Sequence, residues 1–216
     1  LRGDARGTLL HEAVRILVAS RNADGGFGLS AEDALEQAWR AKKPRGLFQG
    51  EKVARFTKKK LLPLLEAFMV AETKYVQRSG TRILALDETR LEYVVDLGPR
   101  DPGHPEIREQ VAIVGVPDRI DEHPDGIFVI DYKTSSASPT GPQMIDFGYR
   151  LQLPIYALAA ANRFGRPTLG VQFVTLDRKG TRSKGIFFKP WNGKHAGALT
   201  QTTAASHSLL DREPAE

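Results

Sequence analysis

The chain has 216 residues and no cysteine, so disulfides, thiolate metal sites and iron–sulfur clusters are excluded, and a reducing compartment is compatible. With 41% hydrophobic and 26% charged residues it can form a packed core, and its net charge of +5 permits a polyanionic partner without requiring one. The sequence contains no run of about 18 apolar residues and no signal peptide, so we expect a cytoplasmic protein with no membrane partner.

The N-terminal part of the chain, residues 1–80, is expected to be a helical region. Apolar residues recur at helical spacing over 8–20, and a second helix, opened by a serine–aspartate capping box, is predicted up to about Lys43. A long helical pattern covers 51–78 and ends before a glycine. Pro63 is a point where this helix can bend.

Strand patterns begin after this region. Five strands are predicted, over 83–97 with a break near Asp87, 110–121, 127–134, 168–176 and 181–189. A helix is predicted over 144–164, between the third strand and the fourth. We therefore expect a core of sheet and helix over 81–190 and a polar C-terminal tail over 191–216.

Three charged residues stand inside apolar strand sequence. Asp118 lies on one predicted strand, and Asp131 and Lys133 lie on one face of the next. A two-residue turn at 124–125 would place Asp118 opposite Asp131, with their Cβ atoms about 5 Å apart. A bulge at Gly126 would shift this register by one residue.

Burying two carboxylates and an ammonium group is costly unless the charges pair or bind a metal. A divalent cation held by two carboxylates beside a lysine can promote hydrolysis of a phosphodiester. The alternative is a structural cluster of the same three charges on a hairpin.

These residues fall within a longer pattern of four short motifs. In chain order the motifs are Gly7-x-x-x-His11, Gly115-x-x-Asp118-Arg119-Ile120-Asp121, Asp131-Tyr132-Lys133 and Gln152-x-x-x-Tyr156. Over about residues 7–176 the chain resembles the RecB-like and AddB-like nuclease domains of the PD-(D/E)XK superfamily. The resemblance implies an α/β fold, in which a central mixed β-sheet is flanked by helices and preceded by an N-terminal helical region.

The resemblance also implies the composition of a metal-dependent active site. His11, Asp118 and Asp131 would bind Mg²⁺ or Mn²⁺. The Tyr132 carbonyl would be an extra ligand, and Lys133 would be the catalytic lysine. Without the resemblance, a lone helical histidine is an ordinary half-buried residue.

Gln152 and Tyr156 are spaced to share one helix face. The resemblance places this pair beside the active site, where it contacts DNA or supports the metal ligands. Pro154 between them predicts that the helix begins or bends near Leu153. The alternative is a helix that packs on the sheet with one polar position.

A basic stretch surrounds the start of the long helix. Its candidate DNA-binding residues are Arg45, Lys52, Arg55, Lys58 and Lys59. Clustered cations attract the phosphates of DNA. The alternative is a solvated helix face.

The resemblance implies a metal-dependent DNA exonuclease that leaves 5′-phosphate ends and acts as the nuclease module of a helicase–nuclease in DNA repair or recombination. Its expected partners are DNA and a helicase domain or subunit. Because the chain starts at Leu1 and the segment that usually precedes the first motif is absent, we expect a fragment of a longer protein. The alternatives are a catalytically inactive DNA-binding or assembly module of the same fold and a small-molecule phosphoesterase.

Overall fold

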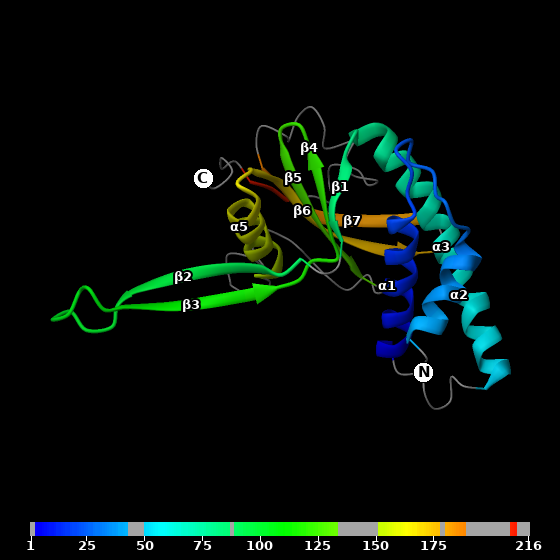
Figure 1. Cartoon of the computed structure of the whole chain (residues 1–216), viewed down its shortest axis with the longest axis horizontal. Helices are drawn as coiled ribbons and strands as arrows, with labels where there is room; N and C mark the ends of the chain where they lie inside the picture. The colour runs from blue at the N-terminus through cyan, green and yellow to red at the C-terminus, as the bar shows by residue number, and fades with distance from the viewer. Residues whose placement is uncertain are drawn as a thin grey trace.

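Helices pack on both faces of a central sheet (Figure 1). The computed structural model describes residues 3–42, 50–86, 89–133, 151–177, 180–188 and 208–210. Its helices are α1 (Gly3–Ala19), α2 (Ala31–Lys42), α3 (Glu51–Ser79) and α5 (Gln152–Phe164). Its strands are β1 (Arg82–Leu86), β2 (Leu91–Pro99), β3 (Arg108–Gly115), β4 (Arg119–His123), β5 (Gly126–Lys133), β6 (Thr168–Asp177), β7 (Gly180–Phe188) and β8 (Ser208–Leu210).

The central sheet has six strands in the order β1-β4-β5-β6-β7-β8. β5 runs parallel to β6 and β7 runs parallel to β8, whereas the other neighbours are antiparallel. A parallel pair requires a crossover connection, and α5 lies in the connection between β5 and β6. The mixed sheet between helices confirms the predicted fold class.

Alternating residues of β5 serve two separate hydrophobic clusters. Phe128, Ile130 and Tyr132 pack in the cluster that contains α1, α2 and α3. Ile127 and Val129 pack in the cluster that contains α5. Because side chains of a strand alternate between faces, β5 is covered on both sides, as its apolar sequence predicts.

The ends of the first helices follow from local sequence. Ser30 precedes α2 and accepts a hydrogen bond from the Asp33 N–H at 3.0 Å, while its own hydroxyl donates to the Asp33 carboxylate. α3 continues through Pro63 as one helix and stops at Gly80, whose φ of 65° and N–H bond to Val76 O form a left-handed cap.

The turn between β4 and β5 has the predicted length. His123 pairs with Gly126, so the turn consists of the two residues between them. The ladder then keeps the predicted register up to Arg119 opposite Ile130. No bulge interrupts this pair of described strands.

The predicted strand over 110–121 is wrong as a single element. β3 ends at Gly115 and pairs with β2, whereas β4 starts at Arg119 and pairs with β1 and β5. Pro117 lies in the link and has no N–H to donate to a ladder, which favours a change of sheet there. Asp118 therefore lies in the link and not on a strand.

β2 and β3 form a separate two-stranded hairpin, which we call the arm (Leu91–Gly115), and it projects from the sheet beside α5 (Figure 1). Leu91 at its base is buried in the α5 cluster. Other apolar side chains of the arm are 44–58% exposed: Val94, Leu97, Ile107, Val111 and Val114. The arm is thus attached to the body mainly through its base.

The remaining element boundaries agree with the sequence in part. β1 ends at Leu86 and β2 begins at Leu91, which confirms the break predicted near Asp87. α5 begins at Gln152, so Pro154 lies in its first turn, where a missing N–H is tolerated; residues 144–150 of the predicted helix lie outside the described residues. The three residues of β8, within the predicted polar tail, pair with β7, and the sequence did not predict this strand.

No helix in the described ranges combines the length and apolar character needed to cross a bilayer.

Candidate functional site

Asp131 and Lys133 lie at the C-terminal end of β5, on the face covered by α5. Asp131 is only 5% exposed, and its Oδ2 forms an ion pair with Lys133 Nζ. Lys133 Nζ also lies 4.9 Å from the centre of the Phe173 ring. The acid and the lysine that the sequence predicts to act together are therefore adjacent.

Asp118 reaches the same strand from the link before β4. Its Oδ2 accepts a hydrogen bond of 2.5 Å from the Tyr132 N–H. The ladder begins one residue later, so Asp118 is not a ladder partner of Asp131, although the register that motivated that pairing is present. Asp118 instead binds the backbone between Asp131 and Lys133.

The environment of Asp131 disfavours its charged form. Its pKa is raised, first by burial and then by the negative charge of Asp118, while Lys133 acts in the opposite direction. Its Oδ2 is buried and has no hydrogen-bond partner of regular geometry among the described residues, apart from the ion pair with Lys133. A buried carboxylate oxygen with unused lone pairs next to a second carboxylate is suited to receive a cation.

His11 lies on α1 and faces Asp118. Its Nδ1 is 3.6 Å from Asp118 Oδ1, and its side chain is 36% exposed. The pKa of His11 is raised, mainly by the side-chain interaction with Asp118, and the charges of Asp118 and Asp131 add to this effect. The structure thus places His11 beside Asp118, and the charge of Asp131 also acts on the imidazole.

Gln152 and Tyr156 connect α5 to the acids. Gln152 Nε2 donates to Asp131 Oδ1 at 3.3 Å and to the Tyr156 hydroxyl at 3.1 Å. The Tyr156 hydroxyl donates in turn to the Val116 carbonyl at 3.2 Å. This series of bonds links Asp131 to the backbone segment that carries Asp118.

The ring of Tyr156 explains why the first residue of the motif around Asp118, Gly115, has no side chain. A Cβ atom at this position would collide with Tyr156 Cε1. Tyr156 is 7% exposed and packs in the α5 cluster, so its ring has little room to move. The absence of a side chain at Gly115 lets Tyr156 reach the Val116 carbonyl.

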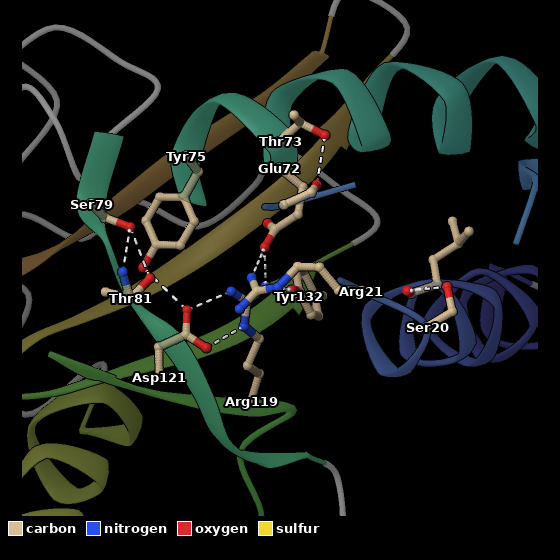
Figure 2. Close-up of polar contacts among 12 residues, drawn as sticks. Ser20, Arg21, Glu72, Thr73, Tyr75, Ser79, Thr81, Arg119, Asp121 and Tyr132 are labelled. Carbon is tan, nitrogen blue, oxygen red and sulfur yellow. Dashed lines mark hydrogen bonds and ion pairs between the residues drawn. The ribbon is translucent and has the colours of Figure 1, made fainter. Parts of the chain in front are cut away.

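The arginine and second aspartate of the same motif point away from the acids, into a buried polar network (Figure 2). Arg119 is fully buried and donates through Nε and Nη2 to both oxygens of Asp121, at 2.6 and 2.5 Å. Its Nη1 donates to Glu72 Oε1 at 2.6 Å and to the Tyr132 hydroxyl at 3.1 Å. Burial raises the pKa of the Tyr132 hydroxyl well above its usual value, and the positive charge of Arg119 offsets only part of this rise.

Sequence reasoning missed Glu72 and its second partner, Arg21. Arg21 Nη1 donates to Glu72 Oε1 at 2.6 Å, and both side chains are almost completely buried. The available signal was the position of Glu72, which falls on the apolar stripe of α3 between Phe68 and Tyr75. A charged residue on a buried helix face requires a partner of opposite charge.

The predicted DNA-binding residues lie on the first turns of α3, except Arg45, which lies outside the described residues. Lys52, Arg55 and Lys59 are exposed. Lys58 forms an ion pair with Glu36 of α2 and lies 5.0 Å from the Trp39 ring. An open groove of about 480 Å³ runs along this region, and its charged lining residues are Glu32, Glu36, Glu51, Arg55, Lys58 and Lys59. α2 thus adds acids that balance the basic residues here.

A complete set of metal ligands is not assembled, since the described ranges contain no group of three His, Asp or Glu side chains placed to hold an ion. The donor chemistry nevertheless fits a hard divalent cation, because Asp118 and Asp131 offer carboxylate oxygens and His11 offers an imidazole. The buried Oδ2 of Asp131, which has the Lys133 ammonium as its partner but no regular hydrogen bond among the described residues, supports the same fit. The ligand role of the Tyr132 carbonyl stays a prediction.

A family model for the PD-(D/E)XK nuclease superfamily matches residues 2–212. The chain belongs to this superfamily, whose members generally use divalent metal ions such as Mg²⁺. A stretch of 64 residues is 39% identical to one subunit of the ATP-dependent helicase/nuclease of Desulforudis audaxviator (strain MP104C). The matched stretch is 30% of this chain and 5% of that relative. These matches confirm the resemblance inferred from the motifs.

Proposed function

We propose that the chain is a metal-dependent deoxyribonuclease domain that hydrolyses phosphodiester bonds. The observation that carries this proposal is the meeting of Asp118, Asp131 and Lys133 around one backbone segment of β5, with His11 beside them. The superfamily match supports nuclease chemistry, and these four side chains are the residues that we propose to perform it.

In this proposal His11, Asp118 and Asp131 hold Mg²⁺ or Mn²⁺, which supplies a Lewis acid and lowers the pKa of water when bound. Gln152 fixes Asp131 through Oδ1. Lys133 presents a cation beside Asp131 that orients the attacking water and offsets the negative charge developing on the phosphorane.

DNA is the proposed substrate. The net charge of +5 favours attraction of a polyanion, and the exposed Lys52, Arg55 and Lys59 are the proposed phosphate contacts on α3. Arg55 and Lys59 line the α2–α3 groove together with Glu32, Glu36 and Glu51, so these acids weaken the attraction of phosphates there.

We further propose that the domain is an exonuclease that leaves 5′-phosphate ends and works beside a helicase domain or subunit in DNA repair or recombination. The short match to one chain of a helicase/nuclease supports this setting. The aligned stretch is only a small part of that relative, so the match does not extend to the relative's other activities.

Digestion of linear duplex, circular duplex and single-stranded DNA with Mg²⁺, Mn²⁺ or EDTA tests the proposal. We expect metal-dependent loss of linear DNA, sparing of the circle, and 5′-phosphate on the products. Cutting of the circle would contradict the exonuclease assignment. Hydrolysis of nucleotide esters alone would identify a small-molecule phosphoesterase, and binding of DNA without cleavage would identify an inactive module.

A further inference from the structure

Glu72 joins two elements of the candidate site that are distant in sequence. It lies on α3, and its Oε1 accepts a hydrogen bond of 2.6 Å from Arg21 and another of 2.6 Å from Arg119 (Figure 2). Arg21 follows the last turn of α1, where its N–H still donates to Val18 O. Arg119 opens β4. One carboxylate oxygen therefore connects the end of one helix to the start of one strand.

Both connected elements lead directly to proposed metal ligands. α1 carries His11, and Arg119 is the chain neighbour of Asp118. His11 and Asp118 meet with 3.6 Å between Nδ1 and Oδ1. α1 extends from His11 to Ala19 as a stiff helix, and the Arg21 N–H is bonded to Val18 O, so a shift at Arg21 is transmitted to the histidine.

The network also holds the strand that carries the other acid. Arg119 Nη1 donates to the Tyr132 hydroxyl, and Tyr132 lies between Asp131 and Lys133 in the chain. The side chain of Tyr132 faces the α1–α3 side of the sheet, whereas those of its two neighbours face α5. The network thus supports the site from behind, through the Tyr132 side chain and the backbone next to Asp118.

The two positive and two negative charges of this network cancel only when all four side chains are present. The side chains of Arg21 and Arg119 are neutralised by Glu72 and Asp121, and none of the four is more than 6% exposed. Removal of one acid leaves an arginine without its counter-charge in a site from which water is excluded. The arginines must then move, and β4 and α1 move with them.

We propose that Glu72 is a positioning residue of the nuclease centre, which through Arg21 and Arg119 sets the separation of His11 from Asp118. This inference rests on the proposed function, because it assigns a role toward the metal. Residues that orient metal ligands from behind change metal affinity by about 10- to 100-fold when they are substituted.

The test compares two Glu→Gln variants of the same kind. Glu122 lies on β4 and also joins two arginines, Arg82 and Arg166, outside the network. Binding of Mn²⁺ to the DNA-free protein is measured as the loss of the electron paramagnetic resonance signal of free Mn²⁺. Cleavage is titrated with Mn²⁺ in parallel. We expect Glu72→Gln to raise both Mn²⁺ midpoints by about tenfold or more, and Glu122→Gln to leave them within about twofold of wild type.

A second pair of variants separates positioning from folding. Glu72→Gln with Arg21→Gln restores charge balance without the bridge, so we expect its melting temperature to recover while the Mn²⁺ midpoint stays high. Glu72→Asp keeps the charge and should retain an intermediate midpoint, and it serves as the decisive variant if Glu72→Gln does not fold.

Two results would overturn the inference. The first is a Mn²⁺ midpoint for Glu72→Gln, or for Glu72→Asp if only that variant folds, that equals the wild-type value. The second is recovery of the midpoint together with the melting temperature in the double variant, which would reduce Glu72 to a folding role. A wild-type protein that neither binds Mn²⁺ nor cleaves would refute the proposed function itself, and this inference with it.

Discussion

At the scale of single residues, His11 differs from the two acids because its donor atom is a nitrogen. Nitrogen ligation favours Mn²⁺ over Mg²⁺ relative to oxygen ligation. We therefore expect His11→Ala to raise the metal concentration for half-maximal cleavage, more for Mn²⁺ than for Mg²⁺, with little change in DNA affinity. Cleavage rates titrated with each metal, together with DNA binding in Ca²⁺, provide the measurement. Unchanged titrations would assign His11 to helix packing.

Gly115 gives a second residue-level prediction. Gly115→Ala should push the Tyr156 ring away and destabilise the protein by about 1–3 kcal/mol, as overpacking of a core does. Denaturant unfolding measures this loss. In a Tyr156→Ala background the three atoms nearest to the added methyl group are gone, so the same substitution should cost much less. An equal cost in both backgrounds would place the constraint in the backbone and not in the ring.

At the scale of elements, the sequence predicted what local rules determine. The two-residue turn before Gly126 set the β4–β5 register, and the apolar pattern of β5 identified a strand covered on both faces. The change of sheet after Gly115 escaped prediction, because alternation continues across it and only Pro117 marks the break. The pairing of Glu72 with Arg119 escaped as well, because it joins positions 47 residues apart and has no local signature.

The arm is an element that can be shortened. Val94 pairs with Ala112, so residues 95–111 can be replaced by an Asn-Gly turn that closes the same ladder. Most side chains beyond this point are exposed, and we expect a loss of less than about 1 kcal/mol in the free energy of unfolding. Urea denaturation tests this. A loss of cooperative folding would show that the outer arm contributes to the core.

At the scale of the whole molecule, metal binding should stabilise the fold. Asp118 raises the pKa of Asp131, after burial, because two nearby negative charges repel each other, and a cation removes that repulsion. With Mn²⁺ at about 100 times its dissociation constant, we expect a rise of about 5–10 °C in melting temperature over EDTA. Asp131→Asn should lose most of this rise. Identical melting curves for the wild type in Mn²⁺ and EDTA would contradict a metal site in the folded chain.

The central claim is that Asp118, Asp131 and Lys133 cut DNA with a divalent metal. Its most direct test is single-turnover cleavage of a labelled linear duplex in Mn²⁺ by the wild type and by Asp118→Asn, Asp131→Asn and Lys133→Ala. Asp125→Asn is the matched control, since Asp125 lies in the exposed β4–β5 turn. We expect each site variant to fold and to lose about 10³-fold or more in rate, and the control to keep the wild-type rate. Near-normal cleavage by any folded site variant would contradict the assignment of that residue, and near-normal cleavage by all three would contradict the account.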